Sequence, residues 1–411
     1  MSEGPEGATA RIPVLTVLPA DPERMPIGGI ASFVRGFVKF APADFELAFL
    51  GVSASRPLGR WADVELEGRA VRLLPVTRGG GARRSRLPIA LRFAVALKAN
   101  RSAVTAALAE QPWILAFHRP GSDLGLPFDP GQAWRVVHLS VADLATPGSE
   151  SRWRRLAPAL DRLEGRSFRR MGRIYVVNRA VADAYRARFP EVAERIAFLP
   201  NWADPTIFRP MAADVRARVR GELAIGHDAP LVLFAGRLEG QKDPLLLADA
   251  FAQLRRLVPD AMLVVAGDGA LREPMRALLE RRHHAGEAVR FHGIVARERL
   301  AQLMAAADLL AITSAFETGP TVGLEALACG LPVVTTPVGE VSRIVGESGA
   351  GRATAVHHSP EALARGMREV IDAGPPLRAV AVEAAGPYLA DRVLAPIYDH
   401  NRRIAAGAAD A

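Results

Sequence analysis

The sequence predicts an α/β protein made of two doubly wound domains, each a parallel sheet with helices on both faces. First, short apolar or β-branched runs alternate with longer amphipathic segments along almost the whole chain. Second, many of these runs, such as 231–235 and 262–266, are apolar without alternation, which indicates strands buried on both faces. Third, about a dozen strand candidates are too many for one ordinary sheet.

Length and composition place the division near the middle of the chain. The 411 residues exceed the usual size of one domain. Asn, Pro and Asp cluster in residues 201–210, directly after a strand candidate, and this composition is typical of a linker. We therefore expect an N-terminal domain over residues 1–205 and a C-terminal domain over 206–390. A terminal helix at 391–411 is expected and could pack back on the first domain.

Each half contributes its own series of strands, separated by helical patterns. The first half has strand candidates at 12–18, 45–51, 71–76, 113–117, 135–139, 173–177 and 196–199. The second half has them at 231–235, 262–266, 289–291, 309–313 and 332–335. The clearest amphipathic stretches between them are 244–257 and 297–307. Ligands of such sheets bind beyond the carboxyl ends of the strands, so we look there for unusual residues.

Composition limits the compartment and the chemistry. The longest uncharged run has 14 residues and contains Pro and Gly, so no transmembrane helix is expected. The first residues lack the basic and apolar regions of a signal peptide. The single cysteine, Cys329, excludes an internal disulfide and a Cys-based zinc site. We therefore expect a cytoplasmic protein. The sequence shows no other spacing typical of metal ligands, so we expect no metal site.

The positive charge is concentrated in the first half. The net charge is +8, and residues 1–200 hold 29 Lys+Arg against 19 Asp+Glu, whereas residues 201–411 hold 23 against 25. This excess suggests an anionic partner, such as a membrane surface or an acidic acceptor, although an arginine-rich composition alone could produce it. The sequence has no nucleic-acid recognition motif and no aromatic–basic interleaving, so no nucleic-acid partner is expected.

The segment 316–334, FETGPTVGLEALACGLPVV, carries the strongest functional signal. Gly319 suits an N-cap, and Pro320 suits the first position of a helix that follows a strand end. The amides of Thr321 and Val322 would then be free donors at the positive end of the helix dipole. Such a terminus is a ready-made phosphate site.

Two glutamates flank this helix start. Glu317 would stay on the loop, and Glu325 would lie about one turn into the helix, while Leu324 and Leu327 would face the core. Two carboxylates beside a phosphate would repel it unless they bind neutral hydroxyls, and a sugar on each side of a diphosphate supplies such hydroxyls. The alternative is an ordinary helix with two surface glutamates.

Further candidates follow other strand ends. Arg237 and Lys242 lie on one loop after a strand and could both reach one phosphate group, or they could be solvated loop charges. Small residues at Gly28-Gly29 and Gly267-Asp268-Gly269 would let the backbone approach a ligand, or simply form turns.

Two histidines close strand candidates in the first half. His118 precedes Arg119, and His138 ends the run at 135–138. Both positions lie at the edge of the sheet where a ligand is expected. A histidine in such a place is also often a satisfied structural residue.

Taken in order, these segments resemble the family-four retaining glycosyltransferases, which have the GT-B fold of two Rossmann-like domains facing an interdomain cleft. The resemblance covers most of the chain and is most specific at Glu317-x7-Glu325, which runs into EALACGLPVV. Its other carriers are Gly28-Gly29, His118, His138, RIYVVN ending at Asn178, LPNWAD at 199–204, Gly236-Arg237 with Lys242, Gly267-Asp268-Gly269, and Phe291-His292-Gly293.

The resemblance implies roles for these residues. Arg237 and Lys242 would hold the diphosphate of a nucleotide-sugar donor and neutralise the leaving group. Glu325 would bind ribose hydroxyls, Glu317 would contact hydroxyls of the transferred sugar, and the backbone near Ile294 would meet the base. The helix start and the glycines at 28, 29 and 267 would complete the donor site.

On the other side of the reaction, His138 resembles the family histidine that contacts the sugar near its reacting carbon. His118 and Arg119 would lie nearer the acceptor. The chain departs from the family at Pro320, which has no amide to donate, and at Trp202, where a glycine is usual.

The implied reaction is retaining transfer of a hexose from a nucleotide-diphosphate sugar to a hydroxyl of a glycan or lipid-linked glycan, in envelope polysaccharide or exopolysaccharide synthesis. The nucleotide sugar is a substrate, and no cofactor is implied. Alternatives are another GT-B nucleotide-sugar enzyme, such as an epimerase, or a non-catalytic nucleotide-sugar-binding protein. The basic and apolar stretch 83–101 could lie as a helix on the inner face of an anionic membrane, or pack on the sheet.

Overall fold

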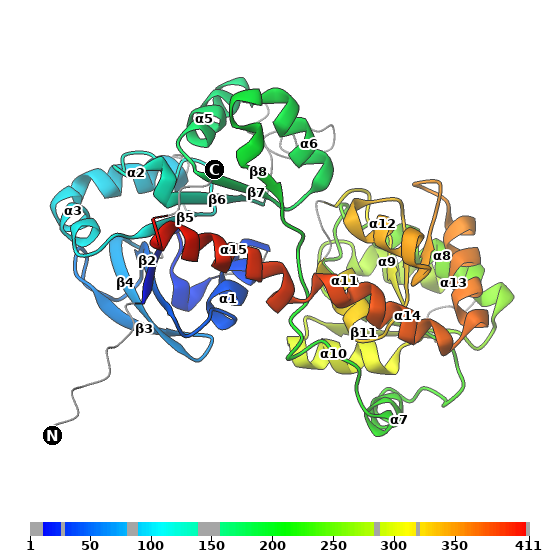
Figure 1. The fold of residues 1–411 in the computed structure, drawn as a ribbon. Helices are drawn as coiled ribbons and strands as arrows, with labels where there is room; N and C mark the ends of the chain where they lie inside the picture. The colour runs from blue at the N-terminus through cyan, green and yellow to red at the C-terminus, as the bar shows by residue number, and fades with distance from the viewer. Residues whose placement is uncertain are drawn as a thin grey trace, which may run out of the picture. The chain divides into compact units, whose positions relative to one another are not determined.

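The computed structural model describes residues 11–25, 29–79, 89–138, 157–282, 288–317 and 321–407. The chain forms two compact units: residues 1–199 join residues 394–411 in the first, and residues 200–393 form the second (Figure 1). The expected boundaries were 205/206 and 390/391. The first observed boundary is earlier because Ala203 bridges to Leu389, and its amide donates to Tyr388 O at 2.9 Å.

The first unit is built on an eight-stranded sheet of order β3-β4-β2-β1-β5-β6-β7-β8. All its pairs are parallel except β3 with β4. Its strands are β1 (Ile12–Val17), β2 (Phe45–Ser53), β3 (Ala62–Leu66), β4 (Arg69–Arg78), β5 (Ile114–Phe117), β6 (Ala133–Val137), β7 (Arg173–Val176) and β8 (Ile196–Phe198). Its helices are α1 (Gly29–Lys39), α2 (Ile89–Ala99), α3 (Arg101–Ala109), α5 (Ala157–Arg169), α6 (Arg179–Arg188) and most of α15 (Ala390–Ala405).

The second unit contains a fully parallel six-stranded sheet of order β11-β10-β9-β12-β13-β14. Its strands are β9 (Leu231–Ala235), β10 (Met262–Ala266), β11 (Val289–Gly293), β12 (Leu309–Ile312), β13 (Val333–Thr335) and β14 (Gly351–Ala353). Its helices are α7 (Ala213–Glu222), α8 (Pro244–Leu257), α9 (Arg272–Arg281), α10 (Arg297–Ala306), α11 (Thr321–Ala328), α12 (Gly339–Ser348), α13 (Pro360–Ala373) and α14 (Pro376–Ala385).

Successive residues of each central strand in the second unit enter different apolar cores. In β9, Leu231 and Leu233 join one core, whereas Val232 and Phe234 join the other. Helices α7, α10, α11, α12 and α14 cover the first face, and α8, α9 and α13 cover the second. This two-sided burial explains why the strands are apolar throughout, and it confirms the doubly wound arrangement expected from the sequence.

Two features of the first unit differ from expectation. β3 was not predicted, because its alternating ADVEL sequence forms a short antiparallel edge strand rather than a buried parallel one. The helix expected within 83–101 ends two residues earlier: α2 covers Ile89–Ala99, and a second helix, α3, begins at Arg101. Asn100 separates the two helices, and its side-chain amide donates to Val76 O (2.8 Å) and Ala96 O (2.9 Å). Residues 80–88 lie outside the described chain.

The C-terminal helix α15 (red in Figure 1) packs on the first unit. The Tyr398 hydroxyl donates to Phe37 O at 2.8 Å, and its ring stacks on the Phe37 ring with centroids 5.2 Å apart. The buried Trp134 indole donates to Asn401 Oδ1 at 2.9 Å. Among the described helices, none has the length and hydropathy that a bilayer span needs.

Candidate functional site

Neighbouring strands of the second sheet end in loops that are bonded to one another. β9 and β12 are adjacent, and the Ala315 amide after β12 donates to Gln241 O after β9 at 2.9 Å. The Thr313 hydroxyl bonds to Lys242 O (2.9 Å) and Asp243 O (3.0 Å). The two loops that carry the predicted phosphate and sugar ligands are therefore one structural feature at the carboxyl edge of the sheet.

Lys242 and Glu317, predicted as partners in one site, are in direct contact. The Lys242 ammonium donates to Glu317 Oε1, and the Ser314 hydroxyl donates to the same oxygen at 2.7 Å. The two charged side chains are only 18% and 7% exposed, so water screens this ion pair weakly. The pair lies at a strand end with a cation and an anion both fixed, which suits a ligand carrying phosphate beside hydroxyls.

The backbone around Lys242 is held in an unusual conformation. Asp243 has left-handed dihedrals (φ 44°, ψ 64°) although it is not a glycine. Its carboxylate caps α8 by accepting from the Leu246 amide at 3.0 Å, and His358 Nε2 lies 3.1 Å from its other oxygen. These contacts stabilise the turn that presents Lys242.

Arg237 lies on the same loop and has partners other than Glu317. Its guanidinium pairs with Glu239 and donates to Gln241 Oε1 at 3.2 Å, and its side chain is 63% exposed. Gln241 in turn donates to Phe316 O at 3.4 Å. The expected joint grip of Arg237 and Lys242 on one phosphate stays a prediction that requires the Arg237 side chain to leave Glu239.

Helix α11 begins at Thr321, and the expected cap residues Gly319 and Pro320 lie outside the described residues. Thr321 and Val322 are half-buried in the first turn, and Leu324 and Leu327 are buried in the core as expected. A side chain at Gly323 would meet Val341 at 2.8 Å, so α11 packs closely on α12.

Glu325 lies beside Arg297 and Asp204, two residues that the sequence analysis did not predict for the site. Its carboxylate is 14% exposed, 3.9 Å from an Arg297 nitrogen, and the same guanidinium is 3.6 Å from Asp204. Burial raises the pKa of Glu325 to about 7; Arg297 opposes this shift and Asp204 adds to it. One sequence signal existed: Arg297 is the first residue of α10, where the helix dipole favours an acid.

Gly267 brings the loop after β10 against the loop after β9. Its φ is +152°, and a Cβ there would be 1.8 Å from Gly236 O, so no other residue fits without moving backbone. Gly267 also bridges to Gly293, which precedes the 77% exposed Ile294. The predicted donor-site glycine and the residue expected near the base thus adjoin one another.

The two predicted histidines form a pair in the first unit. His118 Nδ1 lies 3.4 Å from His138 Nε2, and the Phe33 ring contacts both imidazoles, with centroid distances of 5.3 and 5.1 Å. Burial lowers the pKa of His118 to about 3. Burial lowers the pKa of His138 well below its usual value, and electrostatic interactions with His118, Arg119 and Arg135 lower it further. Both rings are therefore neutral near pH 7.

The accessibility of the remaining first-unit candidates differs. His118 is only 2% exposed, His138 and Arg119 are half-buried, and burial lowers the pKa of Arg119. His138 is therefore the more accessible of the two histidines. Gly29 opens α1 and is exposed, whereas Gly28 lies outside the described residues. Within the described ranges, no group of three or more His, Cys, Asp or Glu side chains could hold a metal ion.

Comparison with known sequences finds similarity within the second unit. Residues 215–386 match the family model for glycosyl transferases group 1. A D-inositol 3-phosphate glycosyltransferase of Kineococcus radiotolerans is 34% identical over 193 residues, which cover 43% of this chain and 44% of that protein. A GDP-mannose-dependent alpha-(1-6)-phosphatidylinositol dimannoside mannosyltransferase of Mycobacterium tuberculosis is 33% identical over 179 residues, 41% of this chain and 44% of that protein. The matches span less than half the length of these relatives.

Comparison with solved structures covers nearly the whole chain. Sucrose-phosphate synthase from Thermosynechococcus elongatus superposes with a TM-score of 0.74 at 20% identity, over 97% of this chain and 100% of that one. WaaG, a glycosyltransferase involved in lipopolysaccharide biosynthesis, gives 0.64 at 21% identity, over 96% and 98%. These likenesses confirm the GT-B fold predicted from the sequence. The chain therefore has the GT-B fold, and its residues 215–386 match the family model for glycosyl transferases group 1.

Proposed function

We propose that this protein is a retaining glycosyltransferase that moves a hexose from a nucleotide-diphosphate sugar to a hydroxyl acceptor. The observation that carries the proposal is the Lys242–Glu317 contact at the ends of β9 and β12, inside the segment that matches the glycosyltransferase family. The family match and the relatives' activities support a sugar donor. A structure of Anabaena HepE in complex with UDP-glucose, whose fold this chain shares with a TM-score of 0.60, also supports it.

The proposed chemistry follows from where charge develops. Breaking the anomeric C–O bond leaves negative charge on the diphosphate and positive charge on the sugar ring. Lys242, Arg237 and the amides of Thr321 and Val322 would stabilise the leaving diphosphate. Loss of one such fixed donor typically costs about 10²–10³ in rate.

Retention of configuration has two possible routes. A double displacement needs a carboxylate nucleophile on the far face of the ring. Glu317 is proposed to contact sugar hydroxyls and is already engaged by Lys242 and Ser314. We therefore favour a same-face reaction, in which the leaving phosphate oxygen takes the acceptor proton.

Substitution at the ion pair tests the catalytic roles. We expect Lys242→Ala and Glu317→Ala to abolish sugar transfer while the protein stays folded. The matched control is the exposed Arg352–Glu369 pair of the same unit, 2.7 Å apart, whose alanine variants should keep wild-type turnover. Near-normal transfer by either purified active-site variant would refute its role. Product analysis by NMR would also separate transfer from epimerisation of the donor sugar.

A screen of donors would define the substrate. We propose binding of a nucleotide sugar without a metal cofactor, because two side-chain cations and a helix terminus are available to the diphosphate. Thermal shift with nucleoside diphosphates and nucleotide sugars should give a clear shift for one base. EDTA should leave both the shift and the transfer rate unchanged, and a loss that added Mg²⁺ restores would contradict the metal-free proposal.

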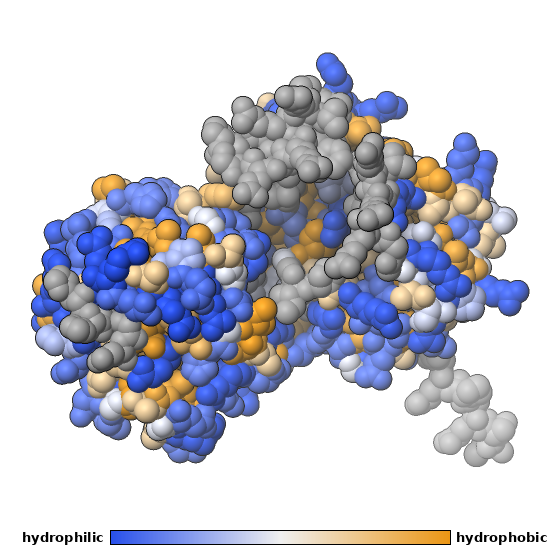
Figure 2. Space-filling view, turned by 180° about the vertical axis from the view of Figure 1, so that it is seen from behind, coloured by the Kyte–Doolittle hydropathy of each residue, from blue (hydrophilic) through white to orange (hydrophobic). Residues whose placement is uncertain are grey.

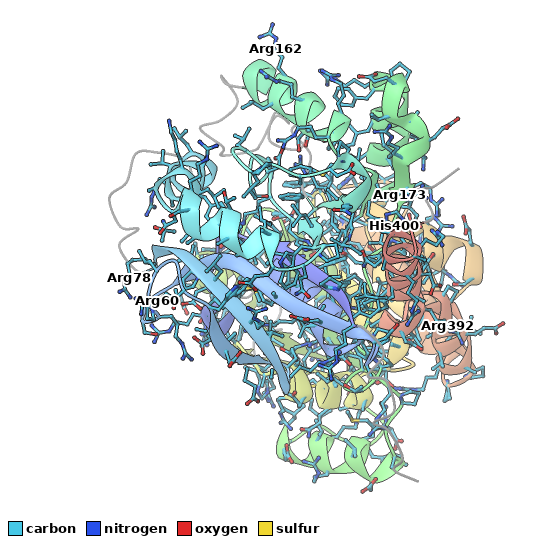
Figure 3. All side chains as sticks on the ribbon, turned by 60° about the vertical axis from the view of Figure 1, so that its left-hand side comes forward. Arg60, Arg78, Arg162, Arg173, Arg392 and His400 are labelled. Atoms are coloured by element: carbon cyan, nitrogen blue, oxygen red, sulfur yellow. The ribbon has the colours of Figure 1, made fainter. Side chains whose placement is uncertain are left out.

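We further propose a cytoplasmic enzyme that docks on an anionic membrane through α2 to reach a lipid-linked acceptor. Phe93 and Leu97 are buried, whereas Leu91 and Val95 are 46% and 60% exposed one turn apart. Basic side chains also reach solvent in this unit, and Figure 3 shows Arg162 projecting outward from α5. Over the face shown in Figure 2, apolar residues lie scattered among hydrophilic ones.

Liposome cosedimentation tests this docking. Wild type should bind vesicles containing anionic lipid at low salt, and Leu91→Ser/Val95→Ser should bind less. No binding to anionic vesicles at low salt would remove the membrane proposal without affecting the proposed reaction, which can be measured with a water-soluble acceptor.

A further inference from the structure

Arg297 joins three segments of the second unit that are far apart in sequence. From the start of α10, one guanidinium nitrogen lies 3.6 Å from Asp204 and another lies 3.9 Å from Glu325 on α11. The guanidinium carbon lies 5.3 Å from the centroid of the Phe208 ring. A guanidinium is planar and has several N–H donors, so it can pair with two carboxylates while its face packs on an aromatic ring.

Asp204 is the fixed end of this arrangement. It is 4% exposed, and its Oδ1 accepts from the Thr206 amide at 3.0 Å and from the Thr206 hydroxyl at 2.7 Å. These bonds hold the carboxylate within a turn, so that its second oxygen faces Arg297. Arg297 itself is 48% exposed and gains its position from Asp204 and Phe208.

We propose that Arg297 is a positioning residue for donor binding: anchored by Asp204 and Phe208, it favours the charged form of the Glu325 carboxylate and holds it in place for the ribose hydroxyls. This inference rests on the proposed function, because a nucleotide sugar must bind at α11 for Glu325 to meet a ribose. It assigns to Arg297 and Asp204 a role in donor affinity, through Glu325.

The charges that face Glu325 predict how donor affinity depends on pH. They are Arg297 from α10, Asp204 from the segment before α7, and Cys329 from α11, whose thiol stays neutral because burial raises its pKa to about 12. An ionised carboxylate can accept from both ribose hydroxyls, whereas a protonated one has lost half of that capacity. Because the pKa of Glu325 is about 7, donor affinity should fall as the pH drops through that value.

Two substitutions should move this transition in opposite directions. Arg297→Gln removes the opposing cation, so Glu325 holds its proton to higher pH. The midpoint should rise by about one pH unit, and donor affinity at pH 7 should fall by up to about fivefold, as the ionised fraction of Glu325 falls. Asp204→Asn removes the neighbouring anion but keeps an oxygen for Thr206, and Phe208 still holds the Arg297 guanidinium, so the midpoint should move to lower pH. Arg297→Lys, which keeps the charge but loses the fork, should lie between wild type and Arg297→Gln.

The experiment is calorimetric titration of the full chain with UDP-glucose and GDP-mannose between pH 6 and 9. Their diphosphates are esterified at both ends and do not titrate in this range. Arg299→Gln is the matched control, because Arg299 lies on the same helix and pairs instead with Glu222 at 2.8 Å. A second ligand distinguishes loss of the ribose contact from general damage to the site. It is the 2′,3′-dideoxy analogue of whichever nucleotide sugar binds, and it lacks the hydroxyls proposed to meet Glu325. Wild type and Arg297→Gln should bind this analogue equally.

The outcomes are distinct. Opposite shifts for Arg297→Gln and Asp204→Asn, with Arg299→Gln unchanged, support the role of Arg297. Equal behaviour of Arg297→Gln and Arg299→Gln overturns it, as does an equal loss of affinity for the ribose and dideoxy forms, and the proposed function survives either result. If wild type binds no nucleotide sugar of a wider panel, the proposed function fails, and this inference fails with it.

Discussion

Glu325 is a buried acid whose protonation couples site chemistry to stability. Burial raises its pKa from 4.5 to about 7, so the folded protein binds its proton more tightly than the unfolded chain does. For an acid shifted upward, the stabilising contribution is complete below the unfolded pKa and is lost as the pH rises through the folded pKa. At alkaline pH the folded protein therefore contains an ionised carboxylate in a buried position, and this lowers its free energy of unfolding.

We expect Glu325→Gln to stabilise the protein at pH 8.5 and to change little at pH 5. The gain at pH 8.5 could reach about 3 kcal/mol, since each unit of pKa shift corresponds to about 1.4 kcal/mol. Urea unfolding at the two pH values measures the difference. Glu369→Gln, on an exposed side chain of the same unit, is the control and should show no such pH dependence. Equal effects of Glu325→Gln at both pH values would contradict the assigned pKa.

The contact between the loops after β9 and β10 requires a glycine at position 267. A Cβ at this residue would lie 1.8 Å from Gly236 O and 2.9 Å from Gly236 C, both backbone atoms that no rotamer change can move. We expect Gly267→Ala to lower the free energy of unfolding by about 2–4 kcal/mol and to weaken donor binding by displacing the loop of Arg237 and Lys242. Gly240→Ala, on the loop after β9 with nothing within 4 Å of its Cβ, should leave both measurements unchanged.

The C-terminal end of α10 is closed by arginines from other helices. Arg220 on α7 is 2% exposed and donates to Ala306 O (2.9 Å) and Gly226 O (2.8 Å), while Asp308 lies 3.5 Å away. Removing this cation would leave buried carbonyl oxygens without their hydrogen-bond donor. We expect Arg220→Leu to lower the free energy of unfolding by about 3–5 kcal/mol in urea titrations. Arg218→Leu, two residues earlier on the same helix and 52% exposed, should match wild type; comparable losses would contradict this account.

The elements that sequence alone predicts well are those with strong local signals. α8 runs over Pro244–Leu257 as expected, because Asp243 caps it and Pro244 occupies its first position. β3 and β14 were missed: β3 alternates polar and apolar residues at a sheet edge, and β14 has only three residues. Short strands take their identity from pairing partners far along the chain, which a local pattern does not contain.

The candidate site shows the same limit. Lys242 and Glu317 were predicted in one site because both follow strand ends and the resemblance assigns both to the donor. Their direct contact depends on the adjacency of β9 and β12, which the sequence did not show. The link from Arg297 to Asp204 and Glu325 was not predicted, because it depends on how α10 and α11 pack against the segment before α7. No spacing along the sequence encodes that contact, although a basic residue at a helix start was a local inconsistency.

The chain as a whole begins and ends in the same unit. Helix α15 starts within the second unit at Ala390 and ends in the first, which takes residues from Leu394 onward. Its contacts there are Tyr398 with Phe37, Asn401 with Trp134, and Arg402 with Asp44 at 2.9 Å. The core of the first unit is thus completed by a helix that follows the second unit in sequence.

Truncation after Val393 should therefore destabilise the first unit selectively. The deletion removes the apolar cover of Phe37 and leaves the fully buried Trp134 indole without its acceptor, which alone costs about 1–3 kcal/mol. Hydrogen exchange should show lost protection in β1, β5 and β6, with β9, β10 and β12 retained, because the second unit has its own cores. Asn401→Leu should give a smaller loss in the same strands. Uniform loss across both sheets would show that the units depend on each other for folding.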